Sequence, residues 1–103
     1  MPLRQRKHVR PPGAEDLRKT LADEWRAPRE GKGRPVLIKE GGGARPVHLY
    51  VIWDRWGDLN QQERSEIIMD AYENAKGQDA ALLVTVAMGL TAAEAKRMRI
   101  EYK

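Results

Sequence analysis

The sequence contains no cysteine. Without thiols the chain has no disulfides, no thiolate nucleophile and no cysteine ligands for zinc or an iron–sulfur cluster. Histidine is scarce as well, because His8 and His48 are the only two and lie far apart along the chain. These absences predict a protein without a metal site or a bound cofactor, and they are compatible with a reducing compartment.

Long hydrophobic runs are also missing. The longest nearly apolar stretch, residues 80–90, is shorter than the about 20 residues that a membrane-spanning helix needs. The N-terminus is basic, but it continues into "HVRPPG" and not into the apolar centre of a secretory signal. We therefore expect a soluble, cytoplasmic protein with no membrane partner.

What the chain does contain is enough for one small domain. Its 103 residues match the size of a single hydrophobic core, which usually holds about 100–150 residues. Residues 1–12 show no apolar periodicity and end in two prolines. We expect these residues to form a flexible basic tail, and residues 13–103 to form a single domain.

Positive charge is concentrated in the first third of the chain. Residues 1–34 carry ten Lys/Arg and five Asp/Glu, whereas residues 35–103 carry nine and ten. A basic arm on a near-neutral body is typical of some nucleic-acid-binding proteins, because Lys and Arg displace counterions from phosphates. It is also typical of tails that only keep a protein soluble. The candidate nucleic-acid contacts are Arg4, Arg6, Lys7 and Arg10.

Hydrophobic periodicity predicts the first three elements. Leu17, Leu21 and Trp25 recur every four residues, which indicates an amphipathic helix. Residues 35–40 and 45–54 are rich in β-branched and aromatic side chains and are separated by "GGGA", so we expect an antiparallel hairpin. The second strand is apolar on both faces, which predicts a central position in the sheet.

Two later helices have clear start signals. Asn60 followed by Glu63, and Thr91 followed by Glu94, fit N-caps with a carboxylate at N3. The first of these helices should end at Gly77.

Between these helices, residues 81–88 form a continuous apolar run, which predicts a strand that is buried in the sheet and parallel to a neighbour. The order of elements is therefore α-β-β-α-β-α. It predicts an α+β fold of two layers, with a three-stranded mixed sheet and helices packed on one face.

The exit of the second strand holds the candidate active-site residues. Asp54, Asp58 and either His48 or Arg55 would have to converge to form an acid/base site or a substrate clamp. Successive strand residues point in opposite directions, however, which favours a charged exit from the sheet. Trp56 lies beyond the strand and next to a glycine, so we expect it to be exposed and to bind a partner together with Arg55.

The helix after Asn60 carries carboxylates at helical spacing. These are Glu63, Glu66, Asp70 and Glu73. Carboxylates at this spacing occur in metal-binding bundles, but those sites also use a Glu-x-x-His pair, and this helix has no histidine. The pattern therefore indicates a solvated acidic face that is suited to docking a basic partner.

The stretch "VHLYVIWDRWGD" resembles the BolA family, in which a histidine-led strand precedes an Asp-x-Phe-x-Gly turn. His48, Asp54, Trp56 and Gly57 stand at corresponding places. The segments "QQERSEIIMDAY" and "LTAAEA" are similar to the family's main helix and closing segment. The resemblance covers roughly residues 14–95, and it implies a fold close to that of type II KH domains.

The BolA resemblance also has departures. The family's cluster-ligating histidine, at the start of the last strand, has no counterpart in residues 77–88, and Glu63 stands where the helix has a histidine. The resemblance therefore implies partner or nucleic-acid binding without the family's iron–sulfur role.

We expect a small non-enzymatic binding or adaptor domain that contacts nucleic acid through its basic arm. The alternatives are a module that binds a protein, including a stress-related BolA-like module without the iron–sulfur ligand, and a small enzyme that uses Asp54 and Asp58. The sequence leaves the oligomeric state open.

Overall fold

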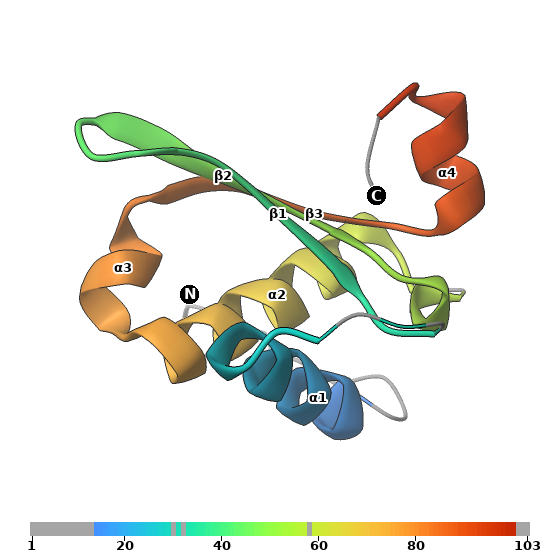
Figure 1. Ribbon diagram of the computed structural model, residues 1–103, viewed down its shortest axis with the longest axis horizontal. Helices are drawn as coiled ribbons and strands as arrows, with labels where there is room; N and C mark the ends of the chain where they lie inside the picture. Colours follow the sequence, from blue (N-terminus) through green and yellow to red (C-terminus); the bar gives the residue numbers. More distant parts are fainter. Residues whose placement is uncertain (1–13, 30, 32, 58, 101–103) are drawn as a thin grey trace, which may run out of the picture.

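The computed structural model describes residues 14–29, 31, 33–57 and 59–100, and it shows an α+β fold in two layers (Figure 1). The elements are α1 (Ala14–Arg26), β1 (Val36–Gly42), β2 (Arg45–Ile52), the 3₁₀ helix η1 (Asp54–Trp56), α2 (Gln61–Lys76), α3 (Gln78–Leu82), β3 (Val84–Leu90) and α4 (Ala92–Arg97). The predicted fold class is confirmed. The basic tail expected at residues 1–12 lies outside the described residues.

The sheet has the order β1-β2-β3. β1 is antiparallel to β2, and β3 is parallel to β2 on its other side. The central position of the second strand and the parallel pairing of the last are thus confirmed.

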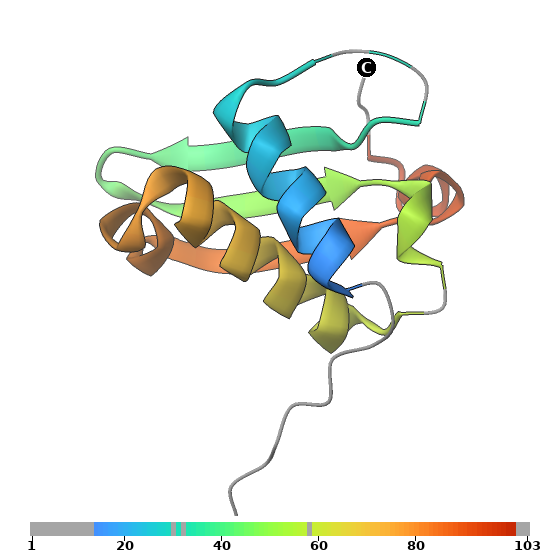
Figure 2. The same cartoon turned by 90° about the horizontal axis from the view of Figure 1, so that it is seen from below.

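The helices α1 and α2 lie together across one face of the sheet (Figure 2). Side chains of β2 alternate accordingly: Val47, Leu49 and Val51 are buried beneath these helices, whereas His48 and Tyr50 on the opposite face are only half-buried. Apolar residues at helical spacing on α1 and α2 complete this core.

The last helix lies on the other side of the sheet (Figure 1). Ala95 of α4 packs with Ile52 and Leu90 in a second, smaller cluster. Leu90 belongs to the face of β3 that is turned away from α1 and α2, so the chain leaves the sheet on that side. The expectation of helices on one face therefore holds for α1 and α2, and α4 covers one end of the opposite face.

The turn between β1 and β2 depends on glycine. Gly41 has a φ of +90°, and a Cβ at this position would collide with the carbonyl oxygen of Pro46. The pairing register also shifts between Glu40 and Gly42, as it does at a β-bulge. A glycine is therefore needed where the two backbones come closest.

Helix boundaries agree with their sequence signals. Asn60 with Glu63 and Thr91 with Glu94 each form a complete capping box. In each box the cap side chain accepts from the N3 backbone N–H, and the N3 carboxylate accepts from the cap backbone N–H.

The last strand differs from its prediction in two ways. It begins at Val84, because the alanine and leucine residues before it form the short helix α3. Ala and Leu are strong helix formers, and β-branched residues begin only at Val84. β3 also lies at an edge of the sheet and is not enclosed by neighbouring strands.

Candidate functional site: a groove beside the first strand

Trp56, expected at the surface, is buried with 1% of its area exposed. Its indole N–H donates to the carbonyl of Val51 at 3.0 Å, and its ring packs edge-to-face on Trp53 with centroids 5.5 Å apart. A Cβ on Gly89 would lie only 2.7 Å from Trp56 Cε2, so the ring occupies space that a larger residue at position 89 would need. The expected exposure is therefore wrong, because the 3₁₀ turn brings the chain back over the sheet and Gly89 leaves room for the indole.

Arg55 is exposed and makes local contacts. Its guanidinium donates to Asp16 of α1 at 2.7 Å and lies 5.2 Å from the centroid of the Trp53 ring. An exposed ion pair contributes about 0–1 kcal/mol, so this contact adds little to stability. Without an exposed Trp56 beside it, Arg55 does not form the expected two-residue contact surface.

The candidate acid/base residues point to different places. Asp54 accepts a hydrogen bond from the backbone N–H of Ala92 at 2.8 Å, at the start of α4. His48 is six residues earlier in an extended strand, about 20 Å away, and packs beside Tyr50 with ring centroids 6.5 Å apart. The structure does not bring Asp54, Arg55 and His48 together. Asp58 and the four basic arm residues lie outside the described residues.

Two of the predicted carboxylates of α2 make separate structural contacts. Glu63 belongs to the capping box, and Asp70 accepts from Arg18 of α1 at 3.0 Å. In the part of the chain that the structure describes, no group of three His, Asp or Glu side chains is arranged to hold a metal ion.

Arg64 of α2 is a buried cation, with 4% of its area exposed. It donates to the carbonyls of Leu59 at 2.8 Å, Gly89 at 3.0 Å and Gly57 at 3.2 Å. It also pairs with Glu94 at 2.6 Å, and this hydrogen bond is the main reason that the pKa of Glu94 is lowered from its ordinary value. All of these partners belong to the chain itself, so Arg64 has a structural role and joins α2 to the end of β3 and to α4.

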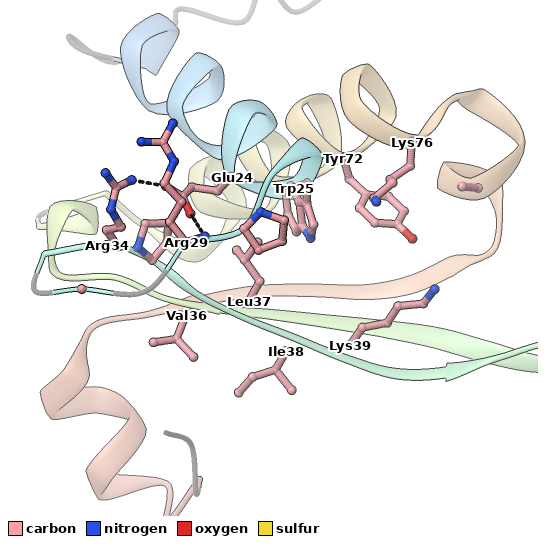
Figure 3. Close-up of a pocket in the computed structure, with 14 residues that line it drawn as sticks. Glu24, Trp25, Arg29, Arg34, Val36, Leu37, Ile38, Lys39, Tyr72 and Lys76 are labelled. Atoms are coloured by element: carbon pink, nitrogen blue, oxygen red, sulfur yellow. Dashed lines mark hydrogen bonds and ion pairs between the residues drawn. The ribbon is translucent and has the colours of Figure 1, made fainter.

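A groove of about 970 Å³ runs along β1, and we call it the β1 groove (Figure 3). Its apolar lining includes Leu37 of β1 and two buried aromatic residues, Trp25 of α1 and Tyr72 of α2. The Trp25 and Tyr72 rings meet edge-to-face with centroids 5.2 Å apart. Each comes from a different element, so the groove exists only in the folded chain.

The charges that line the β1 groove are mostly positive. Among the described residues that line it, the cations are Arg29, Arg34, Lys39 and Lys76, and the one carboxylate is Glu24. Glu24 is 4% exposed, forms an ion pair with Arg34 and accepts from the backbone N–H of Arg29 at 3.3 Å. Within the described lining, Glu24 is therefore engaged with Arg34 and does not balance the positive charges of Arg29, Lys39 and Lys76.

Sequence reasoning missed the β1 groove, although parts of its signal were visible. Lys39 follows three apolar strand residues, and residues 28–35 join α1 to β1 with two prolines and three cations. The sequence does not show which residues lie across the groove from this segment, because Tyr72 and Lys76 belong to α2 and are distant along the chain.

No family model, curated protein or solved structure matches this chain. Among the described helices, none combines the length and the apolar character needed to cross a membrane.

Proposed function

We propose that this protein is a small non-enzymatic binding domain, and that the β1 groove holds a partner that presents apolar groups together with negative charge. The observation that carries the proposal is the described lining, which combines aromatic residues with four cations and one carboxylate that is already paired. An apolar concave surface with a few charged groups is the usual form of a binding site.

A binding role is favoured over catalysis by how the polar groups are used. Acid/base or nucleophilic catalysis needs side chains that converge on one reacting atom. Asp54 bonds to the start of α4, Arg55 to α1, and the carboxylate of the groove, Glu24, to Arg34. Each of these groups is engaged separately by the fold.

Anilinonaphthalenesulfonate, an apolar anion, tests the β1 groove directly. Its fluorescence should rise on titration into the folded protein, and Lys76→Glu should weaken binding by about threefold to fivefold, because an exposed charge interaction is worth up to about 1 kcal/mol. Lys96→Glu, on the exposed surface of α4, is the matched control and should bind like the wild type.

A near-UV circular dichroism spectrum should show that all three proteins keep their packed aromatic residues, since loosely folded states also bind this dye. Failure of the wild type to bind, or equal weakening by both substitutions, would contradict the proposed function.

Nucleic-acid contact through the basic arm is a second proposal. It is supported by the concentration of positive charge in residues 1–34, and it is tested by deleting residues 1–12 and varying the salt. The BolA resemblance is compatible with both kinds of partner, but a shared fold carries no function by itself. A cytoplasmic location belongs to the proposal too, and the lack of cysteine supports it.

A further inference from the structure

We propose that the β1 groove binds its partner by strand addition: an extended acidic segment of another protein pairs with the free edge of β1 as a fourth strand. This inference rests on the proposed function of the groove and names the kind of partner that would fill it. Strand addition takes affinity from backbone hydrogen bonds and specificity from alternate side chains.

The β1 groove meets the edge of the strand and not just one face. Six consecutive residues, 34–39, line it. Neighbouring residues of a strand point to opposite faces, so a hollow on one face would touch only every second residue. Figure 3 shows this alternation, with Leu37 turned toward Trp25 and Val36 and Ile38 turned to the other side of the strand.

The backbone of this edge is directed outward at two positions. The backbone N–H groups of Val47 and Trp53 donate to carbonyls at the two ends of β3. Successive strand residues direct their N–H and C=O to opposite sides, so the even-numbered residues between them, such as Tyr50, direct theirs toward β1. Tyr50 pairs with Ile38. The residues on either side, Leu37 and Lys39, therefore direct their N–H and C=O away from β2.

Within the described residues, β1 has no strand on that outer side, and none of their hydrogen bonds reaches the N–H or C=O of Leu37 or Lys39. Both residues line the groove. A bound strand would find two donors and two acceptors at the groove wall.

The opposite edge of the sheet, formed by β3, is partly covered by side chains of α2. Gln61 of α2 donates to the carbonyl of Gly89 and accepts from its N–H at 3.2 Å, and Ser65 donates to the carbonyl of Ala87. Side chains of α2 thus occupy the N–H and C=O of Gly89 and the C=O of Ala87. A protein that covers one sheet edge in this way and leaves the other beside an apolar groove has one edge suited to a partner strand.

The charges of the β1 groove select an acidic segment. Lys39 lies on the same face of β1 as Leu37, and Lys76 belongs to α2, which covers that face. A strand added to the edge of β1 would turn every second side chain toward this face, where those side chains meet Leu37 and Trp25 as well as the cations. A second copy of this chain would bring the same cations into the same groove, and like charges that face each other oppose pairing. The complementary occupant is an extended segment in which every second residue faces the groove and these groove-facing residues include both apolar and acidic side chains.

The test uses a fluorescein-labelled glutamate–valine heptapeptide, Val-Thr-Glu-Thr-Val-Thr-Glu, in which valine and glutamate take turns on one face of the extended strand. The charge-reversed control is the lysine–valine peptide, which has lysine in place of each glutamate. Binding is followed by fluorescence anisotropy. Lys39→Ala and Lys39→Pro both remove the cation, but only proline also removes the outward N–H. Because that N–H lies outside the β1–β2 ladder, the proline variant keeps the internal pairing.

We expect the glutamate–valine peptide to bind and the lysine–valine peptide not to bind. Lys39→Pro should bind about threefold to tenfold more weakly than Lys39→Ala, the fold-change expected for one backbone hydrogen bond. Amide NMR of the wild type supplies a readout that does not need the variant to fold. On adding the peptide, the Leu37 and Lys39 amides should shift most and exchange with solvent more slowly.

Four results would overturn the inference. Equal binding by the two Lys39 variants, or amide shifts centred on β3, would exclude strand addition at this edge. Dimerisation of the free protein with the same Leu37 and Lys39 amide changes would make a second copy the occupant. If the groove binds anilinonaphthalenesulfonate but not the peptide, strand addition is wrong and the proposed function stands, whereas failure of both rejects the proposed function too.

Discussion

At the scale of single residues, Trp56, Gly89 and Arg64 depend on one another. A Cβ on Gly89 would lie 2.7 Å from Trp56 Cε2 and 2.9 Å from the Cβ of Arg64. Real Cβ atoms do not approach other atoms so closely, so a larger residue at this position would displace the indole or the arginine. The glycine lets the 3₁₀ turn and α2 close over the end of β3.

Trp56→Ala should therefore act on stability. We expect a loss of about 3–5 kcal/mol in the free energy of unfolding, because the substitution leaves a cavity in the core and removes the donor to Val51. Urea unfolding followed by circular dichroism measures the change. Arg55→Ala is the neighbouring control and should cost no more than about 1 kcal/mol. A Trp56→Ala protein of wild-type stability would show that the indole is not part of the core.

At the scale of elements, the Arg64–Glu94 pair joins α2 to α4 across the end of β3. Glu94 has two roles, because it closes the capping box of α4 and accepts from the buried guanidinium of Arg64. α4 has few other buried contacts, with Ala95 as its only buried residue. Its position therefore depends on this joint as much as on apolar packing.

The joint makes stability depend on pH through Glu94. Its pKa in the folded protein is lowered, first by the hydrogen bond from Arg64, so the ionised carboxylate is favoured by folding. This stabilisation is present above the ordinary glutamate pKa of about 4.3 and is lost as the pH falls through the lowered value. Glu94→Gln keeps a capping-box acceptor but removes the charge.

We expect the unfolding free energy of Glu94→Gln to fall less steeply than that of the wild type on acidification from about pH 5 to 3, measured by urea unfolding at each pH. Glu73→Gln, which removes an exposed carboxylate of α2, is the matched control. Wild-type pH dependence in Glu94→Gln would contradict the role of the pair.

At the scale of the whole molecule, positive charge is placed in two regions. One is the N-terminal arm, with Arg4, Arg6, Lys7 and Arg10, and the other is the β1 groove. The two proposals assign different partners to these regions, so variants in one region serve as controls for the other.

Binding of a labelled oligothymidine of about 16 nucleotides tests the arm. We expect affinity to fall steeply between about 50 and 200 mM salt and to be lost when residues 1–12 are deleted, because counterion release drives the contact. Lys76→Glu should bind the oligonucleotide like the wild type. If the deletion binds equally well in high salt, the arm is not a nucleic-acid contact.

The sequence by itself determined the order of the elements, the central position of β2 and the helix starts at Asn60 and Thr91, because periodicity and capping are local properties. It placed the start of β3 too early, since an apolar run without β-branched residues suits a short helix equally well.

Tertiary structure decided the burial of Trp56, the role of Arg64 and the existence of the β1 groove. Each depends on side chains that are distant in sequence, such as Trp25, Leu37 and Tyr72, which meet only after the helices pack on the sheet. A strand's side-chain pattern shows which faces it can bury, but only the packed chain shows which of its edges stays open.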